Sequence, residues 1–241
     1  MRDKMKLTPF CCVVLMILLT QLSACSKKSS STAASSCKLT GINAMSGNAL
    51  ETCTIAYNSD GKVSSIVESS PGSTLTMTYT YSGNVIKMTA SGYTNGDVVT
   101  DSVVVNSDGL MLSDFERNMF DTSLTTYTYA GTEVASSIFQ QGGQAPSATT
   151  FTFINGDLTG TGASDAFTYN DKPSAPGDYL QIEQLLGFAA PYIKTAHQCT
   201  SYTSSGATSN FTYAYDSTGK ITQMVMTGAQ NAIFNYSYDC N

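Results

Sequence analysis

The sequence is poor in the residues that carry most enzyme chemistry. Its 241 residues include no tryptophan, one histidine (His197) and only 12% charged residues, about half the usual share of a soluble domain. So few titratable groups argue against most acid–base and metal chemistry. Only nine basic residues lie beyond the N-terminal segment, too few to neutralise a tract of phosphates. We therefore expect no enzyme, no cofactor, no metal and no nucleic-acid partner.

Serine, threonine and aromatic residues take the place of the missing charged residues. The chain has 31 Ser, 32 Thr, 14 Tyr and 10 Phe, and 41% of its residues are hydrophobic. This share of apolar residues can bury a core, and Thr and Tyr favour strands. The composition therefore predicts a folded β protein.

Residues 1–24 are typical of a secretory signal peptide. Arg2, Lys4 and Lys6 form a positive segment, and an apolar run of about 12 residues follows from Pro9 to Thr20. That run is too short for a transmembrane helix, which needs about 20 residues. The chain is therefore expected to be exported.

The end of this segment, Leu22-Ser23-Ala24-Cys25, resembles the bacterial lipobox. The resemblance implies cleavage before Cys25 and acylation of its thiol, and two or three acyl chains anchor a protein stably. Ser26 resembles the signal for transfer to the outer membrane of Gram-negative bacteria. Residues 25–35, including Lys27 and Lys28, form a polar stretch predicted to be a flexible tether. Surface-exposed lipoproteins often carry acidic residues after the acylated cysteine, and residues 26–35 contain none. We therefore expect the periplasmic face rather than the cell surface.

Four cysteines remain after the signal and the acylated residue: Cys37, Cys53, Cys199 and Cys240. An even number in an exported chain favours disulfides, with three possible connectivities. A turn near Met45–Asn48 would bring Cys37 beside Cys53, which leaves Cys199 for Cys240. We expect these two pairs. Zinc is the rival interpretation, but no CxxC pair exists.

A period of 24 residues runs through the chain. Tyr57, Tyr81, Val105, Tyr129 and Phe153 each precede a glycine-containing turn, and the pattern returns at Tyr215 and Tyr238. Each unit reads as a strand, a turn and a strand, which indicates consecutive hairpins. Such regularity predicts one repetitive domain over residues 36–241.

Apolar and polar residues alternate within the predicted strands. In Thr74–Tyr81, Leu, Met and Tyr share one face and threonines the other. This alternation predicts antiparallel strands with one buried face. We expect an all-β, mainly antiparallel meander of about 14 to 16 strands, curled into a half-barrel; an extended, uncurled repeat sheet is the alternative.

One segment, 177–197, breaks the alternation. It is apolar nearly all round, Asp178 can cap its start and Pro191 marks its end. We predict a single helix near 178–190 in the hollow of the curled sheet.

No catalytic arrangement stands out. A Ser-His-Asp triad would need His197, yet no serine lies in a G-x-S-x-G turn. The carboxylate pairs Asp97/Asp101 and Asp114/Glu116 have spacings common on solvated strands. The Asn58–Gly61 and Asn106–Gly109 turns lack the glutamate that completes a calcium loop, and such sequences suit hairpins.

The repeated Y-x-x-x-G-K/L-[VIL] turns, Phe167–Pro173 (FTYNDKP) and Tyr236–Cys240 (YSYDC) resemble the YD/Rhs-repeat-like lipoproteins of Bacteroidetes, a family of unknown function. Where the family commonly has Asn-Pro after this Lys-Pro, the chain has Ser174-Ala175-Pro176. The architecture is also similar to the half-barrels of lipoprotein-localisation factors, which hold acyl chains. Neither likeness transfers a catalytic residue.

Two functions stay open. One is a non-enzymatic envelope lipoprotein whose groove between sheet and helix binds a lipid or other hydrophobic ligand, with Leu185, Leu186, Phe188 and Tyr192 as its expected walls. The other is a structural or interaction module that contacts protein or glycan through its exposed sheet face and edge strands. A groove larger than about 300 Å³ would favour the first.

Overall fold

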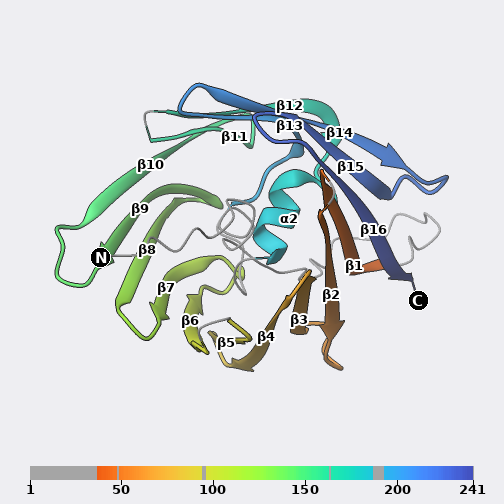
Figure 1. Cartoon of the computed structure of the whole chain (residues 1–241). Coiled ribbons are helices and arrows are strands. Elements are labelled where there is room, and N and C mark those ends of the chain that lie inside the picture. The colour runs from red at the N-terminus through yellow and green to blue at the C-terminus, as the bar shows by residue number, and fades with distance from the viewer. Residues whose placement is uncertain (1–36, 48, 94–95, 163, 187–192, 241) are drawn as a thin grey trace, which may run out of the picture.

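The computed structural model describes residues 37–47, 49–93, 96–162, 164–186 and 193–240. Sixteen strands in this part of the chain form one closed antiparallel barrel, in which each strand pairs with its neighbours in sequence. Figure 1 shows the strands surrounding one short helix, α2 (Tyr179–Leu186). The strands are β1 (Cys37–Ser46), β2 (Ala49–Tyr57), β3 (Val63–Ser70), β4 (Ser73–Ser82), β5 (Val85–Ser91), β6 (Val99–Val105), β7 (Met111–Arg117), β8 (Thr122–Ala130), β9 (Glu133–Gln141), β10 (Ser147–Ile154), β11 (Asp157–Thr161), β12 (Asp165–Pro173), β13 (His197–Ser204), β14 (Ala207–Tyr215), β15 (Ile221–Gly228) and β16 (Ala232–Cys240).

Closure of the sheet corrects the expected half-barrel, and it also excludes the uncurled sheet. Strands β1 and β16 pair along their length, from Cys37 opposite Cys240 to Met45 opposite Ile233. A half-barrel would leave both edge strands with unpaired N–H and C=O groups, and closure pairs them. The antiparallel meander itself and the number of strands are confirmed.

The predicted alternation sets the inside and the outside of the wall. On β4, Leu75, Met77 and Tyr79 are buried while Thr78 and Thr80 are exposed. Inward-facing side chains of β1 to β7 and β13 to β16 form one large apolar core. A second, smaller cluster joins Val134, Leu158 and Ile193.

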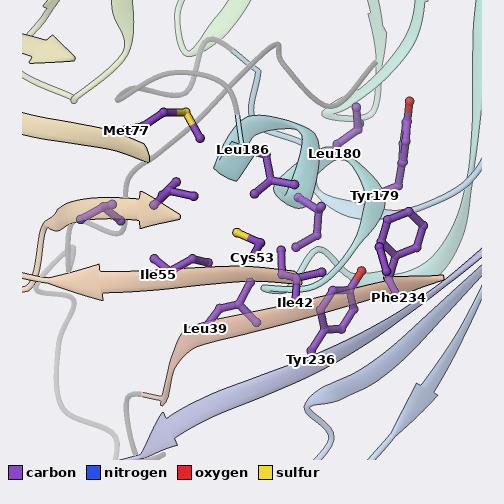
Figure 2. Close-up of a cluster of buried hydrophobic side chains, with 14 of the residues drawn as sticks. Leu39, Ile42, Cys53, Ile55, Met77, Tyr179, Leu180, Leu186, Phe234 and Tyr236 are labelled. Carbon is purple, nitrogen blue, oxygen red and sulfur yellow. The ribbon is translucent and has the colours of Figure 1, made fainter. Parts of the chain in front are cut away.

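The helix belongs to that large core. Tyr179, Leu180, Ile182 and Leu186 of α2 are buried. Figure 2 shows Leu186 directed from α2 toward Ile42 and Cys53 of the wall. The predicted helix is therefore confirmed over residues 179–186, and the rest of its expected span lies among residues 187–192, outside those described.

The 24-residue period corresponds to a hairpin with a β-bulge. Where Tyr57 lies opposite Val63, the next pair is Ala56 with Ser65, so Ser64 is skipped. The same single-residue bulge recurs at the starts of β1, β7, β9, β11 and β15. A bulge disrupts the local ladder of backbone hydrogen bonds.

Tyrosine hydroxyls bond the carbonyl oxygens that precede these bulges. Tyr215 of β14 donates to the side chain of Gln198, but five other tyrosines near the ends of even-numbered strands donate to the carbonyl of the first buried apolar residue of the strand before. These bonds are Tyr57 to Leu39 (2.7 Å), Tyr81 to Val63 (2.9 Å), Tyr129 to Met111 (2.6 Å), Tyr169 to Leu158 (2.7 Å) and Tyr238 to Ile221 (2.8 Å). We call this end of the barrel, where β1 begins, the tyrosine end.

The predicted disulfide pairing is wrong. Cys37 is bonded to Cys240, and Cys53 and Cys199 are free and buried. The expected hairpin does form, but Cys53 lies opposite Ile42, about five residues or 17 Å from Cys37 along the strand. Barrel closure instead brings Cys37 opposite Cys240. Burial raises the pKa of both free thiols.

Candidate ligand cavity

A cavity of about 1030 Å³ lies at the tyrosine end, between α2 and the wall. Its apolar lining comes from β1, β2, β4, β5 and β6 and from the inner face of the helix, and includes Leu39, Tyr57, Ile86, Val105, Ile182 and Leu185. Its polar lining comes mainly from the turns after the even-numbered strands. The arrangement offers an apolar interior with a polar mouth.

The expected groove residues divide between two places. Leu185 lines the large cavity. Leu186 points away from it, into a pocket of about 60 Å³ beside Cys53 and Glu68. Phe188 and Tyr192 lie outside the described residues. Adjacent residues on a helix project about 100° apart, which explains why Leu185 and Leu186 have different surroundings.

Asp178 fixes the start of α2, as predicted. Its side chain is fully buried, and its Oδ1 accepts a hydrogen bond from the Gln181 amide at 3.1 Å. Its Oδ2 accepts from the Ser174 hydroxyl at 2.6 Å. Burial raises the pKa of Asp178 and these hydrogen bonds lower it, with burial the larger effect. The cap satisfies amides that a helix start leaves unpaired.

The segments on both sides of α2 are attached to the wall. Gly177 has φ +99° and lies so close to Tyr238 that an added Cβ would be 2.8 Å from the phenol oxygen. The single hydrogen of this hydroxyl is shared between the carbonyl oxygens of Pro176, at 3.0 Å, and Ile221, at 2.8 Å. After the helix, the Ile193 amide donates to Gln184 of α2 at 3.3 Å, and the Ile193 side chain packs with Val134 and Leu158 of the wall. These contacts hold one wall of the cavity in place.

Sequence reasoning missed three lysines at the cavity: Lys38, Lys62 and Lys194. The ammonium group of Lys38 lies 5.2 Å from the centre of the Tyr57 ring, and that of Lys62 lies 4.8 Å from the centre of the Tyr81 ring. Both are favourable cation–π distances. The sequence carried one signal for these lysines, the order Gly-Lys-apolar at residues 61–63. It places a lysine in the turn that follows a strand-ending tyrosine.

The carboxylates considered for catalysis lie elsewhere. Asp101 and Asp114 face each other inside the wall between β6 and β7, 3% and 8% exposed, with Glu116 nearby. Burial raises the pKa of all three, and for Asp101 the neighbouring Asp114 raises it further. The structure therefore joins Asp101 to Asp114 rather than to Asp97, and none of the four lines the large cavity.

His197 forms a local contact. Its Nδ1 lies 2.7 Å from Asp157 Oδ2, and its amide donates to Asp157 Oδ1 at 2.9 Å. Together these contacts attach the start of β13 to the start of β11, which is a structural role.

The turns weighed against calcium loops are closed by their own asparagines. Asn58 Oδ1 accepts hydrogen bonds from the amides of Asp60 and Lys62, and Asn106 does the same in its turn. This confirms turn chemistry. Across the described residues, no three His, Cys, Asp or Glu side chains gather so as to hold a metal ion. Within those same ranges no helix is both long and apolar enough to span a bilayer.

The model of a protein family described as Teneurin YD-shell matches residues 42–241. The predicted YD/Rhs-repeat likeness is thereby confirmed. Among solved structures, the chain is similar to a porin-like protein from Bacteroides uniformis ATCC 8492, with a TM-score of 0.56 and 16% identity over 83% of this chain and 96% of that one. At this identity the likeness concerns the fold alone. No curated protein matches the chain.

Proposed function

The chain belongs to the Teneurin YD-shell family, and from that premise we propose that this member is a non-enzymatic lipoprotein that binds a hydrophobic ligand. The cavity between α2 and the wall is the proposed site. Its volume, about 1030 Å³, carries the proposal, because it matches the upper end of the 300–1,000 Å³ range for small-molecule sites. A helix that simply filled the barrel would leave no such space.

The position of the cavity supports an anchored carrier. Strand β1 begins at Cys37 at the tyrosine end, about 12 residues after the proposed acylation site, Cys25. An extended chain of that length reaches about 40 Å. Acylation of Cys25 would therefore keep the barrel near the membrane surface.

The outer face of the wall favours an aqueous setting for the barrel. Outward-facing positions are rich in threonine, as Thr78, Thr80, Thr208 and Thr212 illustrate, all of them exposed. Barrels that span a membrane carry an apolar band on this face. This supports attachment through acyl chains rather than through the barrel wall, and the periplasmic face of the outer membrane is part of the proposal.

Occupancy of the cavity is tested with N-phenyl-1-naphthylamine, a neutral fluorescent hydrophobic probe. We expect the Leu185→Trp substitution to fill space beside the helix and to weaken probe binding by about tenfold. Leu50→Trp, at an outer position that is 50% exposed, is the matched control and should bind as the parent does. Native mass spectrometry of protein purified from its own envelope should show a bound lipid. Equal probe binding by both variants, with no bound lipid, would refute the proposal.

A second function rests on one exposed patch. Phe115 and Leu124 are partners in the β7–β8 pair and are 43% and 37% exposed, and Met119 and Phe120 of the adjoining loop are 64% and 77% exposed. Clustered apolar residues on a polar surface mark contact sites. This exposed sheet face therefore supports the alternative function of an interaction module. The edge strands expected to take part in such contacts do not exist in the closed barrel. A Phe115→Ser, Phe120→Ser variant that keeps every envelope partner seen by crosslinking would exclude this function.

A further inference from the structure

We propose that the ligand of the cavity is an anionic amphiphile, a single acyl chain that carries a carboxylate or phosphate headgroup. This inference rests on the proposed function and adds the chemical class of the ligand. It comes from the charges at the mouth, which differ in sign from those of the chain as a whole.

The lining of the cavity reverses the charge balance of the protein. The whole chain has 12 basic and 18 acidic residues. The cavity, however, is lined by three lysines, Lys38, Lys62 and Lys194, and by one acid, Asp60. An apolar interior with an excess of positive charge at its opening complements a negatively charged head on an apolar tail.

The three lysines are available to a ligand. Within the described residues, none of them forms an ion pair with a carboxylate. Lys220 provides the contrast, because it also lies near a tyrosine ring, that of Tyr238, but is paired with Asp216 at 3.3 Å. Lys220 does not line the cavity. The three lysines at the cavity are therefore not neutralised by a carboxylate of the described residues.

Two of these lysines meet at the same turn of the cavity mouth. Lys38 Nζ lies beside the β2–β3 turn, where a Cβ added at Gly61 would be only 3.1 Å away. Lys62 follows directly in the same turn. Each side chain lies near one tyrosine ring, which orients it and leaves ammonium hydrogens free to donate to an anionic oxygen. Ammonium groups that line the same cavity can both donate to the oxygens of a carboxylate or phosphate.

Displacement of N-phenyl-1-naphthylamine from the full-length protein tests the inference. The competitors share a twelve-carbon chain and differ in the head: dodecanoate, dodecyl phosphate, neutral dodecanol and cationic dodecyltrimethylammonium, each below its micelle concentration. We expect at least one of the anions to bind about tenfold more tightly than dodecanol and the cation to bind least, with the preference reduced by salt. The tighter of the two anions identifies the headgroup.

Charge removal provides the matched comparison. In a Lys38→Gln, Lys62→Gln variant the anions should lose most of their tenfold advantage, while dodecanol and the fluorescent probe bind as before. A Lys87→Gln, Lys220→Gln double variant also removes two positive charges, one of them on the outer face of β5, and should leave the preference intact. If dodecanol competes as well as the anions, or if the Lys38→Gln, Lys62→Gln variant keeps their advantage, the anionic class is wrong although the cavity still binds. If the parent protein does not bind the probe at all, the proposed function itself fails.

Discussion

Tyr238 of β16 lies opposite Leu39 of β1, just as Tyr57 of β2 lies opposite Val63 of β3. In each place one residue is skipped next to the pair, and the tyrosine hydroxyl donates to the preceding strand, to Ile221 in one case and to Leu39 in the other. The pair of strands that closes the barrel therefore repeats the contact found in the β2–β3 hairpin and, with Tyr129 opposite Val134, in the β8–β9 hairpin. Closure uses the same interaction as the meander itself.

The tyrosine hydroxyls should stabilise the fold. Tyr57→Phe, Tyr81→Phe and Tyr129→Phe each remove a hydrogen bond of 2.6 to 2.9 Å to the carbonyl oxygen of a buried residue. We expect each to lower the free energy of unfolding by about 1–2 kcal/mol. Urea unfolding followed by circular dichroism measures the change. Burial raises the pKa of Tyr57 and Tyr81 to about 12, so both remain donors across the usable range.

Tyr236→Phe is the control for this series. Its hydroxyl is buried and has no hydrogen-bond partner among the described residues. Removal of an unsatisfied group should leave stability unchanged or raise it slightly. A loss at Tyr236 equal to that at Tyr57 would mean that ring packing, not the hydrogen bond, accounts for the series.

The strands could be predicted from the sequence because two local signals agree along most of the chain. Alternation in stretches such as Thr74–Tyr81 sets the buried face, and glycines such as Gly61, with φ +76°, set the turns. The closed barrel was not predictable in the same way, since a curled sheet and a closed one have identical strands. They differ only in the long-range β1–β16 pairing. The error in the cysteine pairing follows directly from that difference.

The Cys37–Cys240 bond should stabilise the barrel through its unfolded state. It joins residues 203 apart, and closing so long a loop is worth about 5 kcal/mol in the chain-entropy model, with native strain able to reduce this. Cys37→Ser should therefore lower the urea midpoint, and reduction should no longer affect it. Non-reducing peptide mapping should find residues 37 and 240 linked. A linked Cys37–Cys53 peptide would contradict the structure.

Buried carboxyl groups should make stability fall as pH rises. Burial raises the pKa of Glu68 to about 7, and its Oε1 has no hydrogen-bond partner among the described residues. Between about pH 4.5 and 7 the folded protein holds this proton and the unfolded chain releases it, so stability is fully present below that range and declines through it. Asp101 and Asp114 act in the same direction.

Glu68→Gln should remove this part of the pH dependence. We expect it to raise the free energy of unfolding by about 2 kcal/mol at pH 8 and to leave it nearly unchanged at pH 4.5. Thermal melts at both pH values measure the effect. Asp108→Asn, at an exposed turn, is the control. An equal gain for Glu68→Gln at both pH values would show that the pKa of Glu68 is the same in the folded and unfolded protein, and would contradict the prediction.

The site was predicted less completely than the fold, for a physical reason. The apolar pattern of 178–190 identifies a buried helix, but it does not say which side chains meet the wall and which meet a cavity. Leu185 and Leu186 illustrate this, because both are apolar neighbours and only Leu185 lines the large cavity. Lys38 lies in β1 and Lys62 in the β2–β3 turn, and only the pairing of β1 with β2 brings them to the same end of the barrel.

Cys25→Ala tests the proposed anchor. If the thiol is acylated, the variant should either appear in the soluble periplasmic fraction or retain its uncleaved signal, because two or more acyl chains are needed for stable anchoring. The cavity lies in the barrel and not in the anchor, so soluble Cys25→Ala protein should bind N-phenyl-1-naphthylamine as the parent does. Fractionation with mass spectrometry of the N-terminus measures the first point, and probe titration the second. A variant that stays in the membrane fraction with the parent's N-terminal mass shift would show that Cys25 is not the point of attachment.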